Sequence, residues 1–222
     1  LIFINAVNGD PFFANVSLLL HGDGANGSRS IIDSSPSPKI VTVVGNAQIS
    51  TAQAKFGGAS IAFYGSEDYL TLTVSGNEFA FGIGDFTLEW WFNSTSTRPY
   101  ASMMTRVWND PGGISFTLNG VSGNGRPEIY WREFSGAVFI QSSIGGFNDG
   151  AWHHYAFVRS GTSCYMFVDG VICGIRIGVS PSVPSSTIYI GSDRQFLGRE
   201  YTGNIDNLRI TKGVARYSLY PF

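Results

Sequence analysis

Near its C-terminus the chain carries Gly203-Asn-Ile-Asp-Asn-Leu-Arg-Ile-Thr-Lys-Gly-Val-Ala-Arg-Tyr217. Three apolar side chains in this stretch are typical of a β-strand: Ile205, Leu208 and Ile210. Asp206 and Asn207 between them can bond nearby backbone groups, and Gly213 breaks the strand before a short exit segment. The stretch therefore predicts the closing strand of a β-sheet domain.

Outward from this stretch, the chain consists of short apolar runs separated by turn residues, and none has a sustained helical period. About fourteen strands are predicted, at residues 17–21, 40–44, 60–63, 69–74, 86–92, 102–107, 114–119, 128–133, 138–142, 152–159, 163–168, 171–175, 187–191 and 203–211. The clearest alternation places Phe86, Leu88, Trp90 and Phe92 on one face and Thr87, Glu89, Trp91 and Asn93 on the other. This pattern predicts an all-β fold.

The composition fits one globular domain. At 222 residues, 43% hydrophobic and 14% charged, the chain can bury a large core. Its formal net charge of −2 and the lack of a basic run argue against nucleic acid as a partner. No apolar run approaches the roughly 20 residues that span a bilayer, and residues 1–14 lack a signal-peptide pattern. Because Leu1 stands where a start methionine would, we expect a processed product or part of something longer.

Four motifs point to one family: Phe56-Gly-Gly-Ala-Ser60, Asp85-Phe-Thr-Leu-Glu-Trp-Trp91, Trp152-His-His154 and Gly213-Val-Ala-Arg-Tyr217. Together they resemble the laminin-G-like jellyroll of the concanavalin A-like lectin and glucanase superfamily, in the form common in bacteriophage structural proteins and bacterial surface proteins. The resemblance covers roughly residues 16–222. It implies a two-sheet antiparallel jellyroll sandwich over residues 16–222, and the order of strand pairing comes from the resemblance alone.

Residues 1–15 are expected to form an extended N-terminal arm. The segment is apolar, with a turn signal at Asn8-Gly9. An exposed apolar edge invites unwanted pairing, so the arm should be covered. Two interpretations remain open, a strap over the domain's own core and docking onto a neighbouring subunit.

The two cysteines, Cys164 and Cys173, flank a predicted hairpin with its turn at Asp169-Gly170. A two-residue type I′ turn would place Met166 opposite Cys173, and Cys164 opposite Ile175. The cysteines would then be diagonal neighbours roughly 5.5 to 8 Å apart, further than the Cβ separation of about 3.8 Å in a disulfide. We therefore predict free, buried thiols.

Catalysis is not expected. Superfamily members that cleave β-glucans carry Glu-x-Asp-x-x-Glu along one strand, and this sequence lacks that motif. Glu89 has no carboxylate two residues away and is interpreted as a solvated or rim residue. His21, His153 and His154 have no Gly-x-Ser-x-Gly elbow to act with. The resemblance implies that one ring of the Trp152-His153-His154 strand is buried and hydrogen-bonded.

Calcium is a candidate cofactor because many relatives of this kind hold it, and calcium binds oxygen ligands. The candidate ligands are Asp23, Asn26, Asp33 and Asp206. Their spacing does not match the Asp-x-Asp-x-Asp-Gly calcium loop. The alternative is that the first three are turn residues bonding their own backbone. No His or Cys arrangement has zinc spacing.

Carbohydrate binding would depend on exposed aromatic rings in polar loops. Candidate contact residues are Tyr100, Arg106, Trp108, Asn109 and Trp131, whereas Trp90 and Trp152 are assigned to the core. An exposed Trp108 would equally suit a protein interface.

The favoured function is a non-enzymatic structural and interaction module of a virion, a capsid decoration or tail-associated protein that contacts other proteins through the arm. The alternative is a carbohydrate-binding adhesin that recognises host-surface polysaccharide. Either places the protein on a virion or an extracellular surface, with homo-oligomers as a further expectation. A glycan hydrolase or lyase would need two carboxylates meeting in a groove, for which the sequence offers no spacing.

Overall fold

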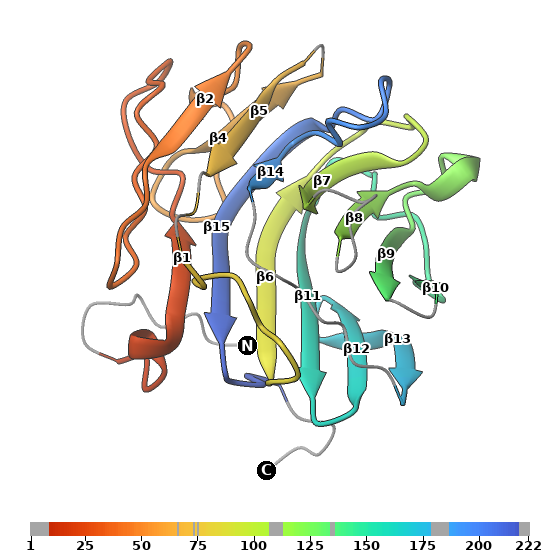
Figure 1. Cartoon of the computed structure of the whole chain (residues 1–222). Coiled ribbons are helices and arrows are strands. Elements are labelled where there is room, and N and C mark those ends of the chain that lie inside the picture. The colour runs from red at the N-terminus through yellow and green to blue at the C-terminus, as the bar shows by residue number, and fades with distance from the viewer. Residues whose placement is uncertain are drawn as a thin grey trace.

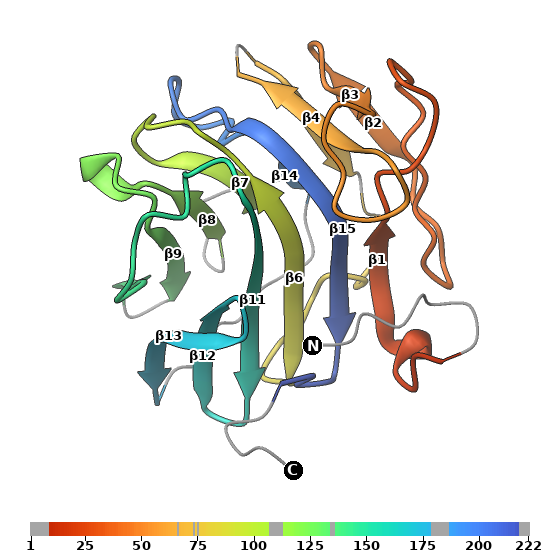
Figure 2. The same ribbon diagram turned by 180° about the vertical axis from the view of Figure 1, so that it is seen from behind.

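The computed structural model describes residues 9–65, 67–72, 74, 76–106, 113–133, 136–178 and 187–217, which form two antiparallel sheets packed face to face (Figures 1 and 2). The eight-stranded sheet has the order β13 (Val171–Ile177), β12 (Ser163–Val168), β11 (Trp152–Ser160), β6 (Phe86–Asn93), β15 (Thr202–Lys212), β4 (Ser60–Tyr64) and β3 (Gln48–Ser50), with β1 (Val16–Leu20) also paired to β15. The seven-stranded sheet has the order β10 (Gly136–Gln141), β9 (Pro127–Glu133), β8 (Ile114–Leu118), β7 (Ala101–Arg106), β14 (Ile188–Ile190), β5 (Tyr69–Leu72) and β2 (Val41–Val44). The predicted two-sheet antiparallel sandwich is confirmed.

The predicted strands lie close to the observed ones, with one omission. β3 was not predicted, because three residues are too few to show an alternation. Among the described residues, the short 3-10 helix η1 (Phe13–Asn15) precedes β1 and a second one, η2 (Gly120–Ser122), lies between β8 and β9. No helix in the described residues is long and apolar enough to cross a membrane.

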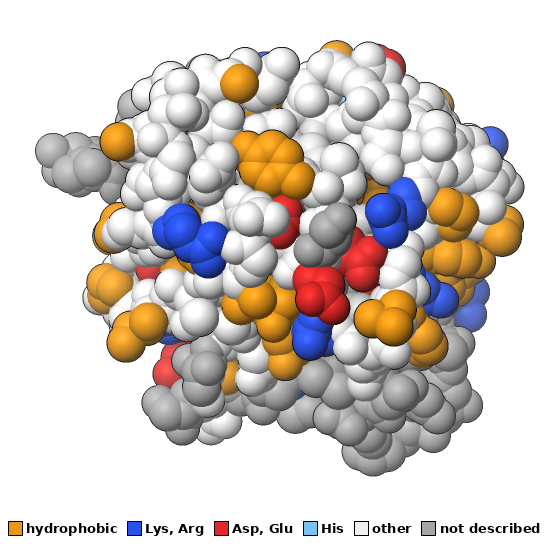
Figure 3. Space-filling model, turned by 90° about the horizontal axis from the view of Figure 1, so that it is seen from above, with side chains coloured by type: hydrophobic (Ala, Val, Ile, Leu, Met, Phe, Trp, Pro, Cys, Tyr) orange, Lys and Arg blue, Asp and Glu red, His pale blue; other side chains and the backbone are white. Residues whose placement is uncertain are grey.

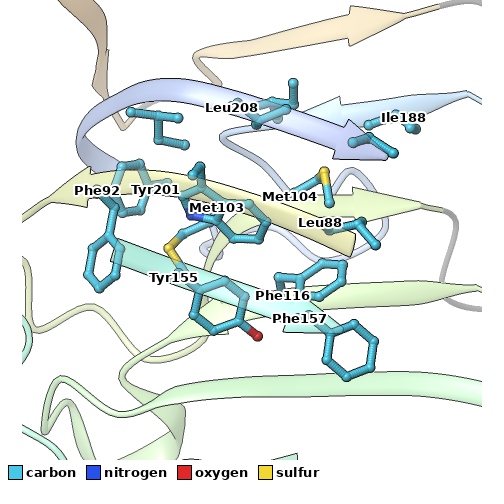
Figure 4. Packing of buried hydrophobic residues seen from close by; sticks show 14 of the residues in the cluster. Leu88, Phe92, Met103, Met104, Phe116, Tyr155, Phe157, Ile188, Tyr201 and Leu208 are labelled. Carbon is cyan, nitrogen blue, oxygen red and sulfur yellow. The ribbon is translucent and has the colours of Figure 1, made fainter. Parts of the chain in front are cut away.

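The core lies between the two sheets and is built on β6. Phe86, Leu88, Trp90 and Phe92 all point inward and are at most 2% exposed, as the alternation predicted. The ring of Trp90 packs against Tyr155 of β11 at 4.7 Å and against Phe116 of β8 at 5.4 Å, measured between ring centres. Figure 4 shows aromatic side chains of β6, β8 and β11 and the methionines of β7, Met103 and Met104, in one interior. Such rings bury large apolar areas and stabilise the sandwich.

The hairpin of β12 and β13 corrects the predicted register. Asp169 and Gly170 have φ of 51° and 79°, the left-handed values that a type I′ turn requires. A bulge then shifts the pairing, so that Met166 faces Gly174 and Cys164 faces Arg176. Neither the Met166 to Cys173 pair nor the Cys164 to Ile175 pair predicted above forms. Both cysteines are nevertheless buried and outside any disulfide, as predicted.

Glu89 is not a solvated residue, and that interpretation is wrong. Its side chain is fully buried on the outer face of the eight-stranded sheet. Arg209 donates from Nε to Oε1 at 2.8 Å, and the Tyr217 hydroxyl donates to Oε2. Burial alone would raise the pKa of Glu89, but bonds and charges from His154, Arg209 and Tyr217 outweigh it and lower that pKa. The lone carboxylate therefore forms the centre of a buried ionic network.

His154 belongs to the same network. Its ring is 3% exposed, and its Nε2 lies 3.4 Å from Glu89 Oε2. One ring of the Trp-His-His strand is thus buried beside a polar partner, whereas His153 is half-buried and contacts Asp149 and Asp169 at its two ring nitrogens.

The described part of the predicted arm lies on the chain's own domain. Asp10 pairs with Arg216, whose Nη2 lies 2.7 Å from Oδ2, and with Arg209 at 3.3 Å. The Asp10 side chain is only 4% exposed. For residues 9–15 this supports the strap interpretation, whereas residues 1–8 lie outside the described residues.

Candidate functional site

The outer face of the seven-stranded sheet is polar and aromatic. On β8, Ile114, Phe116 and Leu118 point into the core, so Ser115 and Thr117 point outward. On β9 the same alternation buries Ile129 and Trp131 and turns Glu128 and Tyr130 outward. This face therefore offers hydroxyl, carboxylate and aromatic groups to whatever covers it.

A loop between β14 and β15, residues 191–201, crosses this face (blue, upper right in Figure 1). The N–H of Tyr201 donates to the Gly191 carbonyl at 2.9 Å, which brings the loop ends together. The N–H of Ser102 on β7 donates to the Arg199 carbonyl at 2.7 Å and fixes the loop to the sheet. The loop has the form of a compact Ω-loop, a type of segment that often carries function.

Gly191 is needed at the base of this loop. Its φ is 92°, and a methyl group there would overlap the ring of Phe63. Only glycine combines this backbone conformation with such a close approach.

The loop and the sheet enclose a pocket of about 160 Å³. Its lining residues are Tyr100, Ser115, Tyr130, Asp193, Phe196 and Arg199. From the end of the molecule that is uppermost in Figure 1, acidic and basic side chains lie close together with hydrophobic side chains around them (Figure 3). The pocket thus has the mixed apolar and polar character of a small-ligand site.

Arg199 is held between two rings of the pocket. Its guanidinium carbon lies 4.8 Å from the ring centre of Tyr100 and 4.2 Å from that of Phe196. Tyr100 also meets Tyr130 edge to face, with ring centres 6.2 Å apart. Cation–π and aromatic contacts of this kind hold the side chains in fixed orientations before any ligand arrives.

Asp193 is the buried carboxylate of the pocket. It is 2% exposed, and its Oδ1 accepts the Gln195 N–H at 3.2 Å. Oδ2 lies 3.7 Å from Arg199 Nη1 and has no hydrogen-bond partner in the described part of the chain. Burial raises the pKa of Asp193 above its ordinary value, although the Gln195 N–H and the charge of Arg199 act in the opposite direction.

Tyr130 forms one side of the pocket, and its hydroxyl is held by the Glu128 carboxylate. Its hydroxyl donates to Glu128 Oε2 at 2.9 Å, and Gln141 Nε2 donates to the other carboxylate oxygen at 2.5 Å. Burial and the Glu128 charge raise the pKa of Tyr130 far above its ordinary value, so the hydroxyl stays a donor.

The structure brings only part of the predicted contact set to this pocket. Tyr100 lines it, with an unusual φ of 53°. Trp131 is 1% exposed and Arg106 is 4% exposed, so neither offers a surface to a ligand. Trp108 and Asn109 lie outside the described residues. Of the two tryptophans assigned to the core, Trp90 is fully buried and Trp152 is half-buried.

Five pocket residues were not predicted from the sequence: Ser115, Tyr130, Asp193, Phe196 and Arg199. Alternation along β9 was an available signal, because it separates the inward Trp131 from the outward Tyr130. Alternation along β8 likewise separates the outward Ser115 from its inward neighbours. Asp193, Phe196 and Arg199 lie on the loop, where no periodicity shows which side chains face the sheet.

Three of the four calcium candidates accept backbone N–H groups. Asp33 accepts from Leu19 and Ser35, Asn26 accepts from Thr51, and Asp206 accepts from Lys55 and Phe56. Within the described ranges, no three or more His, Cys, Asp or Glu residues are grouped to hold a metal ion. Calcium at Asp23, Asn26, Asp33 and Asp206 stays a prediction.

Solved structures with the same architecture come from binding domains. The binding domain of Paraclostridial Mosquitocidal Protein 1 is 14% identical over 91% of this chain and 50% of its own, with a TM-score of 0.71. The binding domain of Botulinum Neurotoxin DC, in complex with SialylT, is 13% identical over 91% and 49%, with a TM-score of 0.66. This chain therefore spans about half the length of these toxin domains, and at such identities the likeness shows the fold alone.

A third structure matches over nearly its whole length. Domain 4 of AbnA, an extracellular arabinanase from Geobacillus stearothermophilus in complex with arabinotriose, is 16% identical over 91% of this chain and 94% of its own, with a TM-score of 0.70. No curated protein matches the sequence significantly. Residues 64–215 match a laminin-G-type family whose description is Concanavalin A-like lectin/glucanases superfamily. The chain belongs to the concanavalin A-like lectin/glucanases superfamily.

Proposed function

We propose that this protein is a non-enzymatic carbohydrate-binding domain of an extracellular surface, with its ligand site in the pocket beneath the loop of residues 191–201. One observation carries this function: aromatic rings and a buried carboxylate converge on one small open pocket. A sugar ring has apolar faces that pack on aromatic side chains, and it has hydroxyls that need polar partners.

The chemistry of each wall suits one part of a sugar. Tyr130 and Phe196 offer ring surface, Arg199 offers N–H donors, and Asp193 offers an acceptor oxygen. Hydrolysis of a glycosidic bond would need two carboxyl groups on either side of that bond. Asp193 is the one carboxylate among the described lining residues, so binding fits the pocket better than hydrolysis does.

A row of aromatic residues extends the pocket across the sheet. Tyr69 on β5 and Tyr189 on β14 meet at 5.9 Å on one side, and Tyr130 and Phe139 meet at 4.7 Å on the other. Alternation with buried neighbours turns all four outward. Because adjacent strands lie about 4.8 Å apart, such a row suits an extended polysaccharide better than a lone monosaccharide.

The similar structures support this function. Domain 4 of AbnA holds arabinotriose, and the Botulinum Neurotoxin DC domain is in complex with SialylT. The virion setting that the sequence motifs suggested has no counterpart among these structures, and the adhesin alternative agrees with them better. Contact of the N-terminal arm with other surface proteins, and homo-oligomers, stay predictions that light scattering would test.

A glycan array followed by calorimetry tests the proposal. We expect the unmodified protein to bind defined glycans, and Phe196→Ala to weaken that binding by about tenfold, equivalent to about 1.4 kcal/mol. The matched control is Leu197→Ala, because Leu197 is 87% exposed on the same loop and does not line the pocket. An array without any bound glycan, or equal losses in the two variants, would contradict the proposed site.

A further inference from the structure

We infer that this pocket selects neutral sugars over acidic ones, because Asp193 presents a buried acceptor oxygen suited to a ligand hydroxyl and its charge already compensates that of Arg199. The inference rests on the proposed function and adds the class of ligand. It follows from the geometry of Asp193, from the fixed position of Arg199 and from the size of the pocket.

The first step is the state of the Asp193 carboxylate. Its side chain lines the pocket at 2% exposure, and Oδ1 is occupied by the Gln195 N–H. Oδ2 is buried without a hydrogen-bond partner among the described residues. Leaving a buried polar group unsatisfied is costly, and native proteins rarely do so without a reason such as a ligand site.

The second step is that Arg199 does not meet this need. Its Nη1 lies 3.7 Å from Oδ2, which is an ion-pair distance but too long for a hydrogen bond. The stack between Tyr100 and Phe196 holds the guanidinium where it is. The missing donor must therefore come from what enters the pocket, and sugar hydroxyls are donors of the right size.

The third step is charge. Among the described lining residues, Arg199 is the one cation and Asp193 the one anion, so their charges cancel. The nearby Arg98 is paired with Glu200 at 3.0 Å, and Arg194 is stacked on Tyr69 at 4.7 Å, away from the lining. A carboxylated sugar would place a second anion beside Asp193 without an uncompensated cation, and two like charges at short range repel.

The fourth step is size. A pocket of about 160 Å³ is smaller than the roughly 300 to 1,000 Å³ of sites that enclose whole small molecules. It would hold one sugar ring, with its hydroxyls toward Asp193, while the rest of the chain follows the aromatic row outside. The favoured ligand is thus one unit of a neutral polysaccharide.

The test compares matched neutral and acidic glycans on the intact chain. Arabinotriose and lactose serve as neutral probes, and sialyllactose serves as the acidic partner of lactose. We expect binding of at least one neutral probe, with sialyllactose weaker than lactose by about tenfold or more. Comparable binding of the acidic and neutral members of the pair would overturn the inference.

Asp193→Asn supplies the second arm, with Asp149→Asn as the control because Asp149 is an exposed carboxylate outside the pocket lining. Asp193→Asn should lower neutral-glycan affinity by about tenfold to a hundredfold. It should also raise sialyllactose affinity, because Arg199 loses its counter-charge. Thermal unfolding of each variant establishes that it is folded.

The two levels of the proposal fail in different ways. If the array shows no bound glycan at all, the proposed function falls. If the unmodified protein binds only acidic glycans and Phe196→Ala abolishes that binding, the site stands and the selection for neutral sugars is wrong. The comparison on unmodified protein decides the inference even if Asp193→Asn does not fold.

Discussion

Glu89 is the residue whose burial has the largest expected consequence for stability. Its carboxylate lies between Arg209, Arg216 and Tyr217, with Arg209 Nη2 at 2.7 Å and Arg216 Nε at 3.8 Å. Glu89→Gln would remove one of the two carboxylates, Glu89 and Asp10, that compensate the buried cations, so we expect a loss of about 3 to 5 kcal/mol in the free energy of unfolding. Urea unfolding of the variant and the unmodified protein measures this loss in free energy. Asp149→Asn, which removes an exposed charge, should cost less than about 1 kcal/mol, and equal losses would contradict this account.

Asp206 gives the protein a specific pH dependence. Burial raises its pKa to about 6 from an ordinary value of 3.8, and the Asp23 charge adds to this, although N–H groups of Phe56, Lys55 and Asn207 oppose it. The folded state therefore binds this proton more tightly than the unfolded state does, so the contribution of Asp206 to stability falls as pH rises from about 4 to about 6.

Asp206→Asn removes that titration. The unfolding temperature of the variant minus that of the unmodified protein should increase as pH rises from about 4 to about 7. Asp10 and Glu89 titrate in both proteins and cancel in the difference. Parallel curves over this range would show that the Asp206 carboxyl does not titrate as described.

At the scale of elements, β15 depends on one glycine. Gly203 has a φ of 143°, and a methyl group there would overlap the carbonyl oxygen of Asn93 on β6. Gly203→Ala should therefore destabilise the protein by well over about 1 kcal/mol. The control is Gly161→Ala, because Gly161 also has a positive φ of 59° but has open space around it. Denaturant unfolding that ranks the two variants equally would remove the steric argument.

Strands could be predicted from the sequence because alternation along β6 is a local signal. The ionic network could not, since Glu89 and Arg209 are 120 positions apart and a lone carboxylate shows no sign of its partner. The pocket could not be predicted for a related reason. The position of the pocket depends on the N–H of Ser102 on β7 donating to the Arg199 carbonyl, a contact between distant segments. Tyr100 was the one lining residue that loop chemistry indicated.

At the scale of the molecule, the two outer faces of the sandwich carry different features. The eight-stranded sheet is covered by residues 9–15 and by the segment that ends at Tyr217, tied together through Asp10 and Glu89. The seven-stranded sheet carries the pocket. Because the core separates these faces, a change on one should affect stability without affecting ligand binding on the other.

Asp10→Asn tests this separation. Burial alone would raise the Asp10 pKa, but bonds from Arg216 and the Phe12 N–H, with the charges of Arg216 and Arg209, lower it, so its contribution to stability is present at neutral pH and is lost as pH falls below about 4. The variant should have a lower unfolding temperature at pH 7, with a smaller difference in acid. Its glycan affinity, measured by calorimetry well below the unfolding temperature, should stay within about twofold of the unmodified protein. A larger loss of affinity in the fully folded variant would mean that the outer face of the eight-stranded sheet and the pocket are coupled through the core.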